Sequence, residues 1–396
     1  MRATVGTLRG DGRGWVLLVV SLGWFSTLGF FFTIPAMVPF VKETFEVSNA
    51  TVGLAITALW VFYGAFQLPA GYLTDRTGER LTMAASLVVG TVSLVALASA
   101  PQFFLLVAAC ALFGAGAGLF ATPRVTSLQA TYPENDGTAL GIVLALGSVA
   151  GAAVPFAAGR FAANADWRLA FLFGVPVFLA VAVGTWRFVP SHTRETTAAE
   201  GEAGSLLVSL ATMFRKPAVR RSAAAATCTF FVFEGLLAFL TTYLVTSKGL
   251  DAATAATYYG LFFVAAAVAQ PVGGNVADFV GHRRVLVGVT ALYAVTLAAM
   301  PLASGRLVIG AVVLLLGVQR GSTPVMNAYV AAVLPEEVKG TGYGLLRTTF
   351  MGVAALGPVV AGALADAASF GVVFYLLAAV AAVGTLLYAI LPPREQ

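Results

Sequence analysis

Charged residues are scarce in this 396-residue sequence: Asp, Glu, Lys and Arg make up 10% of it, whereas hydrophobic residues make up 59%. About a quarter of the residues of a water-soluble globular protein are charged, so this composition excludes that class. The chain has two histidines, His192 and His282, and two cysteines, Cys110 and Cys228. None of them has metal-ligand spacing with acidic residues, and no phosphate-binding loop is present. We therefore expect neither an enzyme nor an ATP-driven pump, and no cofactor or metal.

Long apolar stretches dominate the chain instead. Twelve segments of about 18 to 27 mostly apolar residues are each long enough to cross roughly 30 Å of hydrocarbon as an α-helix. Their Ala, Leu and Gly content favours helices over the alternating strands of a membrane barrel. The sequence thus predicts an all-α integral membrane protein whose spans lie near 15–40, 51–73, 81–100, 103–130, 138–163, 168–189, 221–246, 253–275, 284–303, 306–333, 341–364 and 371–391.

The distribution of Lys and Arg predicts the orientation of these spans. With a cytoplasmic amino terminus, fifteen of the 23 basic residues fall on the cytoplasmic side, five on the other side and three inside spans. Basic residues accumulate in cytoplasmic loops, so both termini are expected in the cytoplasm and the protein in the cell membrane. Topology therefore accounts for the net charge of +5. No basic patch remains for a nucleic-acid partner.

The chain repeats itself at a constant offset of 203 residues. Gln67, Gly114 and Pro155, for example, correspond to Gln270, Gly317 and Pro358. An ungapped match of glycine, proline and polar residues across several helices indicates a duplicated six-helix unit. We expect an N-terminal bundle at 1–189, a linker at 190–220 that includes a possible interfacial helix, "LLVSLATMF", and a C-terminal bundle at 221–396.

A charged motif between the second and third spans carries a family resemblance. "GYLTDRTGERL", residues 71 to 81, resembles the signature G-x-L-x-D-R-x-G-R-[KR]-x of the major facilitator superfamily, with Glu79 at a usually basic position. The resemblance covers essentially the whole chain, and it implies two six-helix bundles that expose a central cavity to each side of the membrane in turn. The motif residues are Gly71, Asp75, Arg76, Gly78 and Arg80 in the first copy and Gly274, Asp278, Gly281, Arg283 and Arg284 in the second.

The two motif aspartates are predicted to hold the cytoplasmic side closed. The resemblance implies that Asp75 docks on the helix start at 339–344, where free N–H groups and the helix dipole favour a negative charge. By the repeat, Asp278 would dock at 136–141. The alternative is that both aspartates are loop charges that set topology. We expect the motif glycines to allow close backbone approach or tight turns, and Asp75→Asn to impair transport while sparing folding.

Two charged residues are expected near mid-membrane in the second half. Glu234 is the acidic residue placed deep inside a span, where an ionised carboxylate costs several kcal/mol unless it is paired, hydrated or protonated. It is a candidate for proton coupling or cation binding, or else a permanent structural partner of an arginine. Arg320 lies at similar depth and is either that partner or a substrate ligand. Gly317 and Gly321 beside it are expected to leave room.

Further candidates for the cavity come from both halves. Arg124 corresponds by the repeat to Asn327, and a cation facing an amide suits a carboxylate or another small anion. Arg124 is alternatively close enough to the cytoplasmic interface to snorkel there. Trp24 and Phe230 either border an apolar solute or simply pack. Arg347 is expected to be an interfacial anchor or a partner of Asp75.

Some positions depart from patterns of the resembled family. Cys110 stands where many proton-coupled members carry an arginine, and Val154 and Ala158 replace two glycines of an antiporter pattern in the fifth span. These departures weaken an assignment to drug:proton antiport.

The sequence therefore predicts a secondary active transporter that moves a small organic solute by alternating access. Proton coupling is expected, and the surplus of basic cavity residues favours an organic anion. The alternative is proton-coupled efflux of lipophilic or cationic compounds, and a channel or transporter-like sensor is a further one. The partners are the solute, protons and the lipid bilayer, and a monomer is expected. Neither the solute nor the direction of transport follows from these residues.

Overall fold

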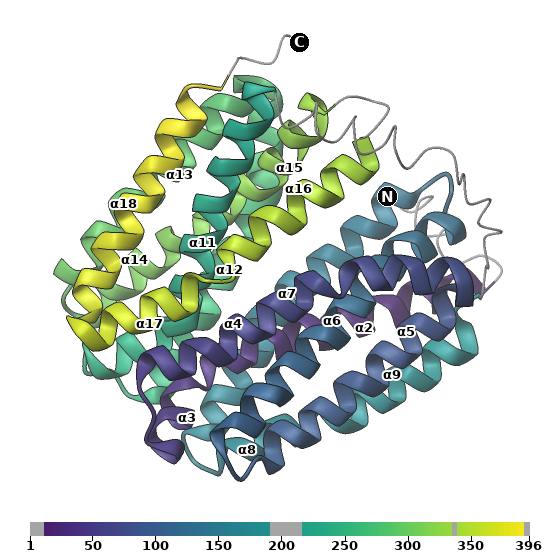
Figure 1. Ribbon diagram of the computed structural model, residues 1–396, viewed down its shortest axis with the longest axis horizontal. Coiled ribbons are helices and arrows are strands. Elements are labelled where there is room, and N and C mark those ends of the chain that lie inside the picture. The colour runs from purple at the N-terminus through teal and green to yellow at the C-terminus, as the bar shows by residue number, and fades with distance from the viewer. Residues whose placement is uncertain (1–11, 191–215, 335–338, 392–396) are drawn as a thin grey trace. The chain divides into compact units, whose positions relative to one another are not determined.

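The computed structural model describes residues 12–190, 216–334 and 339–391, and of residues 331 and 339–343 it describes the backbone only. Within these ranges the chain forms helices and no β-strand (Figure 1). The first half contains α2 (Arg13–Ala36), α3 (Val38–Phe45), α4 (Asn49–Ala65), α5 (Gln67–Ser99), α6 (Phe103–Thr131), α7 (Asp136–Ala162), α8 (Trp167–Leu172) and α9 (Gly174–Phe188).

The second half contains a similar series of helices. It consists of α11 (Pro217–Thr246), α12 (Ala252–Val280), α13 (His282–Ala299), η2 (Met300–Leu302), α14 (Arg306–Val318), η3 (Gln319–Gly321), α15 (Ser322–Val333), α16 (Lys339–Ala354), α17 (Gly357–Ala367) and α18 (Phe370–Ala389). The expected interfacial helix "LLVSLATMF" lies outside the described residues.

Helix starts repeat at the offset found in the sequence. Helices begin at residues 49, 103, 136 and 167, and again at 252, 306, 339 and 370, each pair 203 residues apart. The two motif glycines repeat as well, because Gly78 has φ 82° and Gly281 has φ 91°. Only glycine adopts such a conformation without strain, so both positions make a turn that another residue would disfavour.

Eleven stretches within the described ranges are long and apolar enough to cross a membrane. One of them, Asn49–Ser99, has 51 residues, far more than the roughly 20 that one crossing needs. Gly78 interrupts it with non-helical geometry, so this stretch supplies two of the twelve expected spans. The prediction of an all-α membrane bundle is confirmed.

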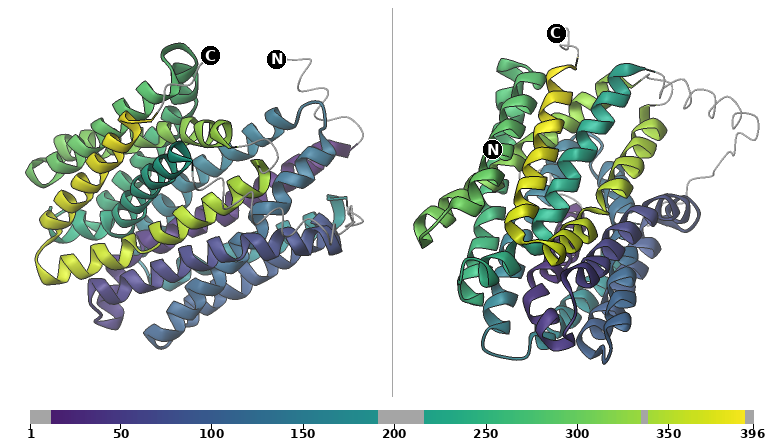
Figure 2. Two further views of the ribbon diagram at one scale, coloured as in Figure 1. Left: turned by 45° about the horizontal axis from the view of Figure 1, so that its top comes forward. Right: turned by 60° about the vertical axis from the view of Figure 1, so that its left-hand side comes forward.

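The helices pack into two compact units. One comprises Met1–Val47, Leu54–Thr196 and Asp251–Gly260, and the other comprises Ser48–Gly53, Thr197–Leu250 and Leu261–Gln396. We call them unit 1 and unit 2. In unit 1, α5 packs along α6 and α9, and α2 packs along α7. In unit 2, α18 packs along α11 and α13, and α11 also contacts α16 and α17 (Figure 1, Figure 2).

Close helix contacts and surface composition both fit a bundle in lipid. Gly114 packs against the carbonyl of Leu59 in unit 1, and Gly317 makes the repeat-equivalent contact with Phe262 in unit 2. Small residues allow such close crossings where lipid removes the hydrophobic drive between helices. Many large apolar side chains face outward, among them Leu307, which is 90% exposed. Such a surface is stable when hydrocarbon covers it.

Candidate functional site

Glu234 on α11 is the buried acid of unit 2. Its side chain is 1% exposed, and neither carboxylate oxygen has a hydrogen-bond partner among the described residues. Buried polar atoms are almost always satisfied by protein, water or a ligand. An isolated carboxylate here therefore requires a proton, water or a cationic ligand.

Arg320 lies near Glu234 but does not pair with it directly. The two side chains interact electrostatically, yet they form neither a hydrogen bond nor an ion pair within 4.0 Å. The Arg320 guanidinium carbon instead lies 4.2 Å from the ring centre of Phe233 and 5.9 Å from that of Phe230. The direct pair that the sequence left open is thus not formed, and aromatic rings hold the guanidinium.

Arg320 occupies a break in its helix. The expected continuous span at 306–333 is divided into α14, the 3-10 turn η3 and α15, and Arg320 is the central residue of η3. A short 3-10 turn within a helix is a common feature of functional hinges. The structure therefore distinguishes this position from the rest of the span.

Two further polar side chains belong to the same group. Tyr293 on α13 is 1% exposed, and its hydroxyl has no hydrogen-bond partner in the described ranges. Arg347 on α16 has a buried Nε without a partner there. Both interact electrostatically with Arg320. We call Glu234, Tyr293, Arg320 and Arg347 the Glu234 cluster.

The sequence did not assign either side chain to this cluster. Tyrosines within spans usually pack, so Tyr293 gave no signal apart from its hydroxyl, which requires a partner when buried. Arg347 was expected at the interface or beside Asp75; its positive charge acts on Arg320 by repulsion, and both expected roles stay predictions. An arginine inside a span commonly faces the bundle interior, and this principle could have placed it.

The glycines next to Arg320 pack against α12. A Cβ on Gly317 would clash with the carbonyl oxygen of Phe262, and a Cβ on Gly321 would lie 2.7 Å from that of Ala269. We expected these glycines to leave room for the arginine or a solute. That expectation is wrong, because the backbone of α12 fills the space.

Unit 1 holds a simpler basic site. Arg124 on α6 is 7% exposed, and its guanidinium carbon lies 3.7 Å from the ring centre of Trp24 on α2. The arginine is therefore buried against an aromatic ring and does not snorkel to the interface. Gly147 on α7 packs against the indole nitrogen of Trp24, where a larger residue would clash.

Asn327, the repeat equivalent of Arg124, is a partly exposed residue of α15 in unit 2. Arg124 and Asn327 belong to different units. Their arrangement across a common cavity stays a prediction. Phe230 stacks near Phe350, with ring centres 5.3 Å apart, so it packs within unit 2 as well as bordering Arg320.

The first charged motif surrounds the turn at Gly78. Arg80 donates a hydrogen bond from Nε to the carbonyl of Val189 at 2.7 Å, which joins the start of the third span to the end of α9. The guanidinium carbon of Arg76 lies 4.4 Å from the Tyr72 ring centre. Asp75 is partly exposed. Two of these side chains thus have local structural partners.

The second motif copy is more open. Asp278 is exposed, and Arg284 donates from Nη1 to the carbonyl of Val280 at 3.3 Å. Arg283 interacts electrostatically with Tyr329. A Cβ on Gly274 would meet nothing within 4 Å, and one on Gly71 only a side-chain methyl at 3.9 Å. Among the described residues neither Gly71 nor Gly274 makes a close backbone approach, whereas the tight turns, the other part of the expectation, are present at Gly78 and Gly281.

The predicted docking contacts of the motif aspartates stay predictions. The predicted partner of Asp75 is the helix start at 339–344, and the side chains of 339–343 are outside what the structure describes. Asp278 and its expected partner at 136–141 belong to different units.

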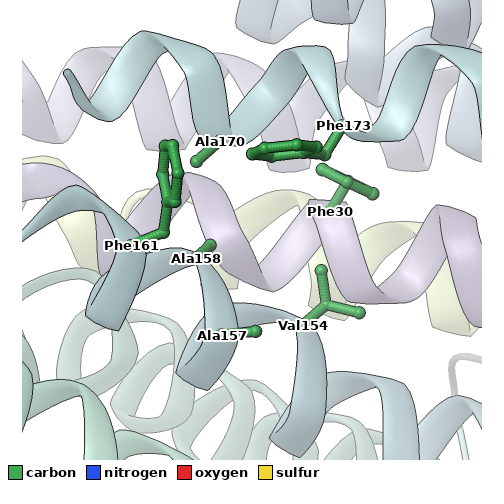
Figure 3. Close-up of a pocket in the computed structure, with 7 residues that line it drawn as sticks. All are labelled: Phe30, Val154, Ala157, Ala158, Phe161, Ala170 and Phe173. Atoms are coloured by element: carbon green, nitrogen blue, oxygen red, sulfur yellow. The ribbon is translucent and has the colours of Figure 1, made fainter. Parts of the chain in front are cut away.

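A small apolar pocket in unit 1 is separate from these charged sites. It has a volume of about 280 Å³ and lies between α2, α7 and α8 (Figure 3). Its lining contains no polar side chain, so it offers nothing that would orient a charged solute. The residues that line it are Phe30, Val154, Ala157, Ala158, Phe161, Ala170 and Phe173.

Metal ligation is not suggested by the described part of the chain. No group of three or more His, Cys, Asp or Glu side chains there is arranged to hold a metal ion. Cys110, which is buried, and Cys228, which is partly buried, are free cysteines.

Comparisons with known proteins agree with the fold. The profile of the family described as Major Facilitator Superfamily matches residues 19–268 and 249–396. A hexuronate transporter of Bacillus subtilis is 26% identical over 63% of this chain and 61% of its own length. The multidrug resistance protein MdtG of Yersinia enterocolitica is 26% identical over 92% of this chain and 90% of its own length.

Solved structures show the same architecture. A bacterial homolog of the human lysosomal transporter Spinster superposes with a TM-score of 0.81 at 17% identity, covering 96% of this chain and 97% of that one. The nucleoside transporter NupG, solved as a point mutant, gives a TM-score of 0.81 at 11% identity over 95% and 98% of the two chains. At these identities the likeness concerns the fold alone.

Proposed function

This chain belongs to the major facilitator superfamily, and on that premise we propose that it carries a small organic anion across the cytoplasmic membrane together with protons. The observation that carries this proposal is the Glu234 cluster. It gathers two arginines, one acid and one tyrosine inside unit 2, with no direct ion pair between Glu234 and Arg320. The positive charge of the arginines is thus available to an anionic solute.

Proton coupling follows from the charge balance of this cluster. When Glu234 is ionised, its carboxylate competes with a bound anion for electrostatic attraction to Arg320 and Arg347. Protonation of Glu234 removes that competitor, so it strengthens anion binding. Linkage is reciprocal, so a bound anion favours protonation of Glu234 to the same extent. A proton and an anion would therefore load together and leave together.

The similar proteins give limited support to this solute class. The hexuronate transporter is named for an organic anion, and the aligned region spans 61% of its length. In our proposal the carboxylate of such a solute binds Arg320, and Phe230 and Phe233 border its apolar part. Arg124, stacked on Trp24, and Asn327 provide further polar contacts in unit 1 and unit 2.

Efflux of lipophilic or cationic compounds is the second candidate. The similarity to MdtG over 92% of this chain favours it, as do the aromatic rings around Arg320. In that case Glu234 binds the cation or exchanges it for a proton, and the arginines are structural. The two candidates assign opposite roles to Glu234 and Arg320.

We also propose that both termini are cytoplasmic and that the transporter acts as a monomer. The orientation rests on the excess of basic residues in the loops assigned to that side. Labelling of single cysteines at 163 and 304 by a membrane-impermeant maleimide in intact cells would test it, because both loops are predicted to be outside.

A binding screen followed by a transport assay tests the proposed function. Purified protein is heated with glucuronate, galacturonate and small monocarboxylates, and separately with tetraphenylphosphonium. We expect a carboxylate to raise the melting temperature, and liposomes with an alkaline interior to take it up faster than liposomes without a pH gradient. Stabilisation by tetraphenylphosphonium alone would instead support the efflux candidate, provided that an inward proton gradient drives movement of this cation in the opposite direction.

A further inference from the structure

The carboxylate of Asp366, at the end of α17, binds the first turn of α4. Its Oδ1 accepts hydrogen bonds from the backbone N–H of Asn49 at 3.0 Å and from the Asn49 side-chain amide at 2.6 Å. Its Oδ2 accepts one from the backbone N–H of Ala50 at 2.7 Å. We call these three bonds, between residues more than 300 positions apart in sequence, the Asp366 contact.

The Asp366 contact is a favourable one on physical grounds. The first N–H groups of a helix have no partner within the helix, and the helix dipole favours an anion at that end. Hydrogen bonds to an ionised group are roughly twice as strong as neutral ones. Here one carboxylate satisfies two such N–H groups and an amide.

Glycines bring the two helices together at this point. Gly362 on α17 packs against the carbonyl of Asn49, and a Cβ on Gly53 of α4 would lie 2.6 Å from the carbonyl oxygen of Pro358. The Asp366 contact therefore closes a tight helix crossing and is not an isolated surface pair. Asp366 itself is exposed, so water can replace its hydrogen bonds when the helices separate.

Helix α4 passes from one unit to the other just after this contact. Residues 48–53 belong to unit 2, whereas α4 from Leu54 onward belongs to unit 1. If the two units move relative to each other, either the Asp366 contact breaks or α4 bends within one residue of Gly53. Breaking three hydrogen bonds that water can replace costs less than disrupting a helix inside a membrane.

The repeat-equivalent contact lacks this acid. The first turns of α12, residues 251–260, belong to unit 1, where Gly159 packs against Ala256. Ala163 stands where the repeat would place an equivalent of Asp366. The start of α12 is instead capped locally, since Asp251 accepts from Thr254 N at 2.8 Å and from Thr254 Oγ1 at 2.7 Å. Because Ala163 has no carboxylate, the second crossing lacks the equivalent of the Asp366 contact.

We propose that the Asp366 contact is a releasable connection that keeps the outer face of the transporter closed and breaks when that face opens. The orientation proposed from the distribution of Lys and Arg places residues 48–50 and 366 on the outer side of the membrane, whereas the motif aspartates are on the cytoplasmic side. The inference rests on family membership and on alternating exposure, and it is independent of the solute and of proton coupling.

Distances between spin labels test this proposal without a substrate. Cysteines replace Ala163 in unit 1 and Ser304 in unit 2, both exposed, in a protein whose Cys110 and Cys228 are changed to alanine. Pulsed electron paramagnetic resonance then measures the label separation in lipid nanodiscs. We expect Asp366→Ala to increase the fraction of molecules with the longer separation about tenfold, as expected for loss of charge-assisted hydrogen bonds.

Matched variants make the result specific. Asp251→Ala removes an equivalent local cap and should leave the label distances unchanged. Asn49→Ala removes one of the three bonds and should shift them in the same direction by less, and it serves as the readout if Asp366→Ala does not fold. Label distances in folded Asp366→Ala, or in Asn49→Ala in its place, that match those of the Asp366-containing protein would overturn the proposal.

Discussion

The basic sites of the two units differ in kind, although they occupy halves of a duplicated chain. Unit 1 places one buried arginine on one indole ring, whereas unit 2 gathers two arginines, an acid and a tyrosine. None of the unit 2 residues has a chemically similar repeat equivalent: Glu234, Tyr293, Arg320 and Arg347 correspond to Phe31, Gly90, Ala117 and Leu144.

Several of the residues that do repeat serve the backbone. Gly78 and Gly281 share a left-handed conformation, and Gly114 and Gly317 make the same helix crossing. Duplication has therefore preserved positions where geometry requires glycine, together with the motif charges Asp75/Asp278 and Arg80/Arg283, whereas the charged residues inside the spans have diverged. Under the proposed function, proton-linked chemistry would belong to unit 2 and unit 1 would supply a fixed cation.

The change with the largest expected effect removes the acid of unit 2. Glu234→Gln should abolish stimulation of carboxylate uptake by a pH gradient and slow net uptake about tenfold or more, because proton and anion no longer load together. Binding of the carboxylate in the thermal-shift assay should survive. Uptake that still responds to the pH gradient would assign coupling to another residue.

Loss of the central arginine should come next. Arg320→Gln should weaken carboxylate binding about 10- to 100-fold, since a hydrogen bond to a charged group contributes about 1.5 to 3 kcal/mol. The substitution also leaves the negative charge of Glu234 less compensated, so the melting temperature of the protein should fall. Adding Glu234→Gln to this variant should restore the melting temperature. A carboxylate affinity that is unchanged in Arg320→Gln would exclude the arginine as a solute ligand.

The basic site of unit 1 should be less sensitive. Trp24→Phe keeps an aromatic ring of smaller size beneath Arg124 and should weaken carboxylate binding by about 1 kcal/mol or less. Arg124→Gln should weaken it more than Trp24→Phe but leave the pH dependence of uptake unchanged. Isothermal titration of both variants checks the order, and a loss of pH dependence in Arg124→Gln would contradict the division of roles between the units.

The smallest expected effect concerns the backbone positions that the halves share. Gly281→Ala should lower the free energy of unfolding by about 1 to 3 kcal/mol, because alanine is strained at a φ of 91°. Gly274→Ala is the matched control, since open space surrounds it within a helix, and it should be neutral or slightly stabilising. Equal melting temperatures for the two variants would mean that the turn at Gly281 can adopt another conformation.

Sequence periodicity, composition and the 203-residue offset were sufficient for the fold. They placed the spans within a few residues, because a membrane helix must be about 20 apolar residues long and glycines and prolines mark its interruptions. Gly78 is the exception to simple counting, because its non-helical geometry turns the chain between the second and third spans without a connecting loop.

The candidate site was less predictable. Glu234, Arg320 and Arg124 were found because a charge inside a span is costly and therefore conspicuous. Tyr293 was missed and Arg347 was not assigned to the Glu234 cluster, since periodicity does not show which faces of α13 and α16 meet inside unit 2. The glycines beside Arg320 were misinterpreted for the same reason, because a missing side chain permits close packing as well as an open space.

The 3-10 turn that holds Arg320 changes the angular phase of everything that follows it. A 3-10 helix advances by about 120° per residue and an α-helix by about 100°, so three such residues rotate the rest of the rod by about 60°. A helical wheel drawn straight through 306–333 therefore assigns the wrong azimuth to Asn327. If this turn converted to regular α-helix, the part of the span that follows it would rotate about the helix axis. The Asn327 amide would then point in another direction, while the axis itself kept its place.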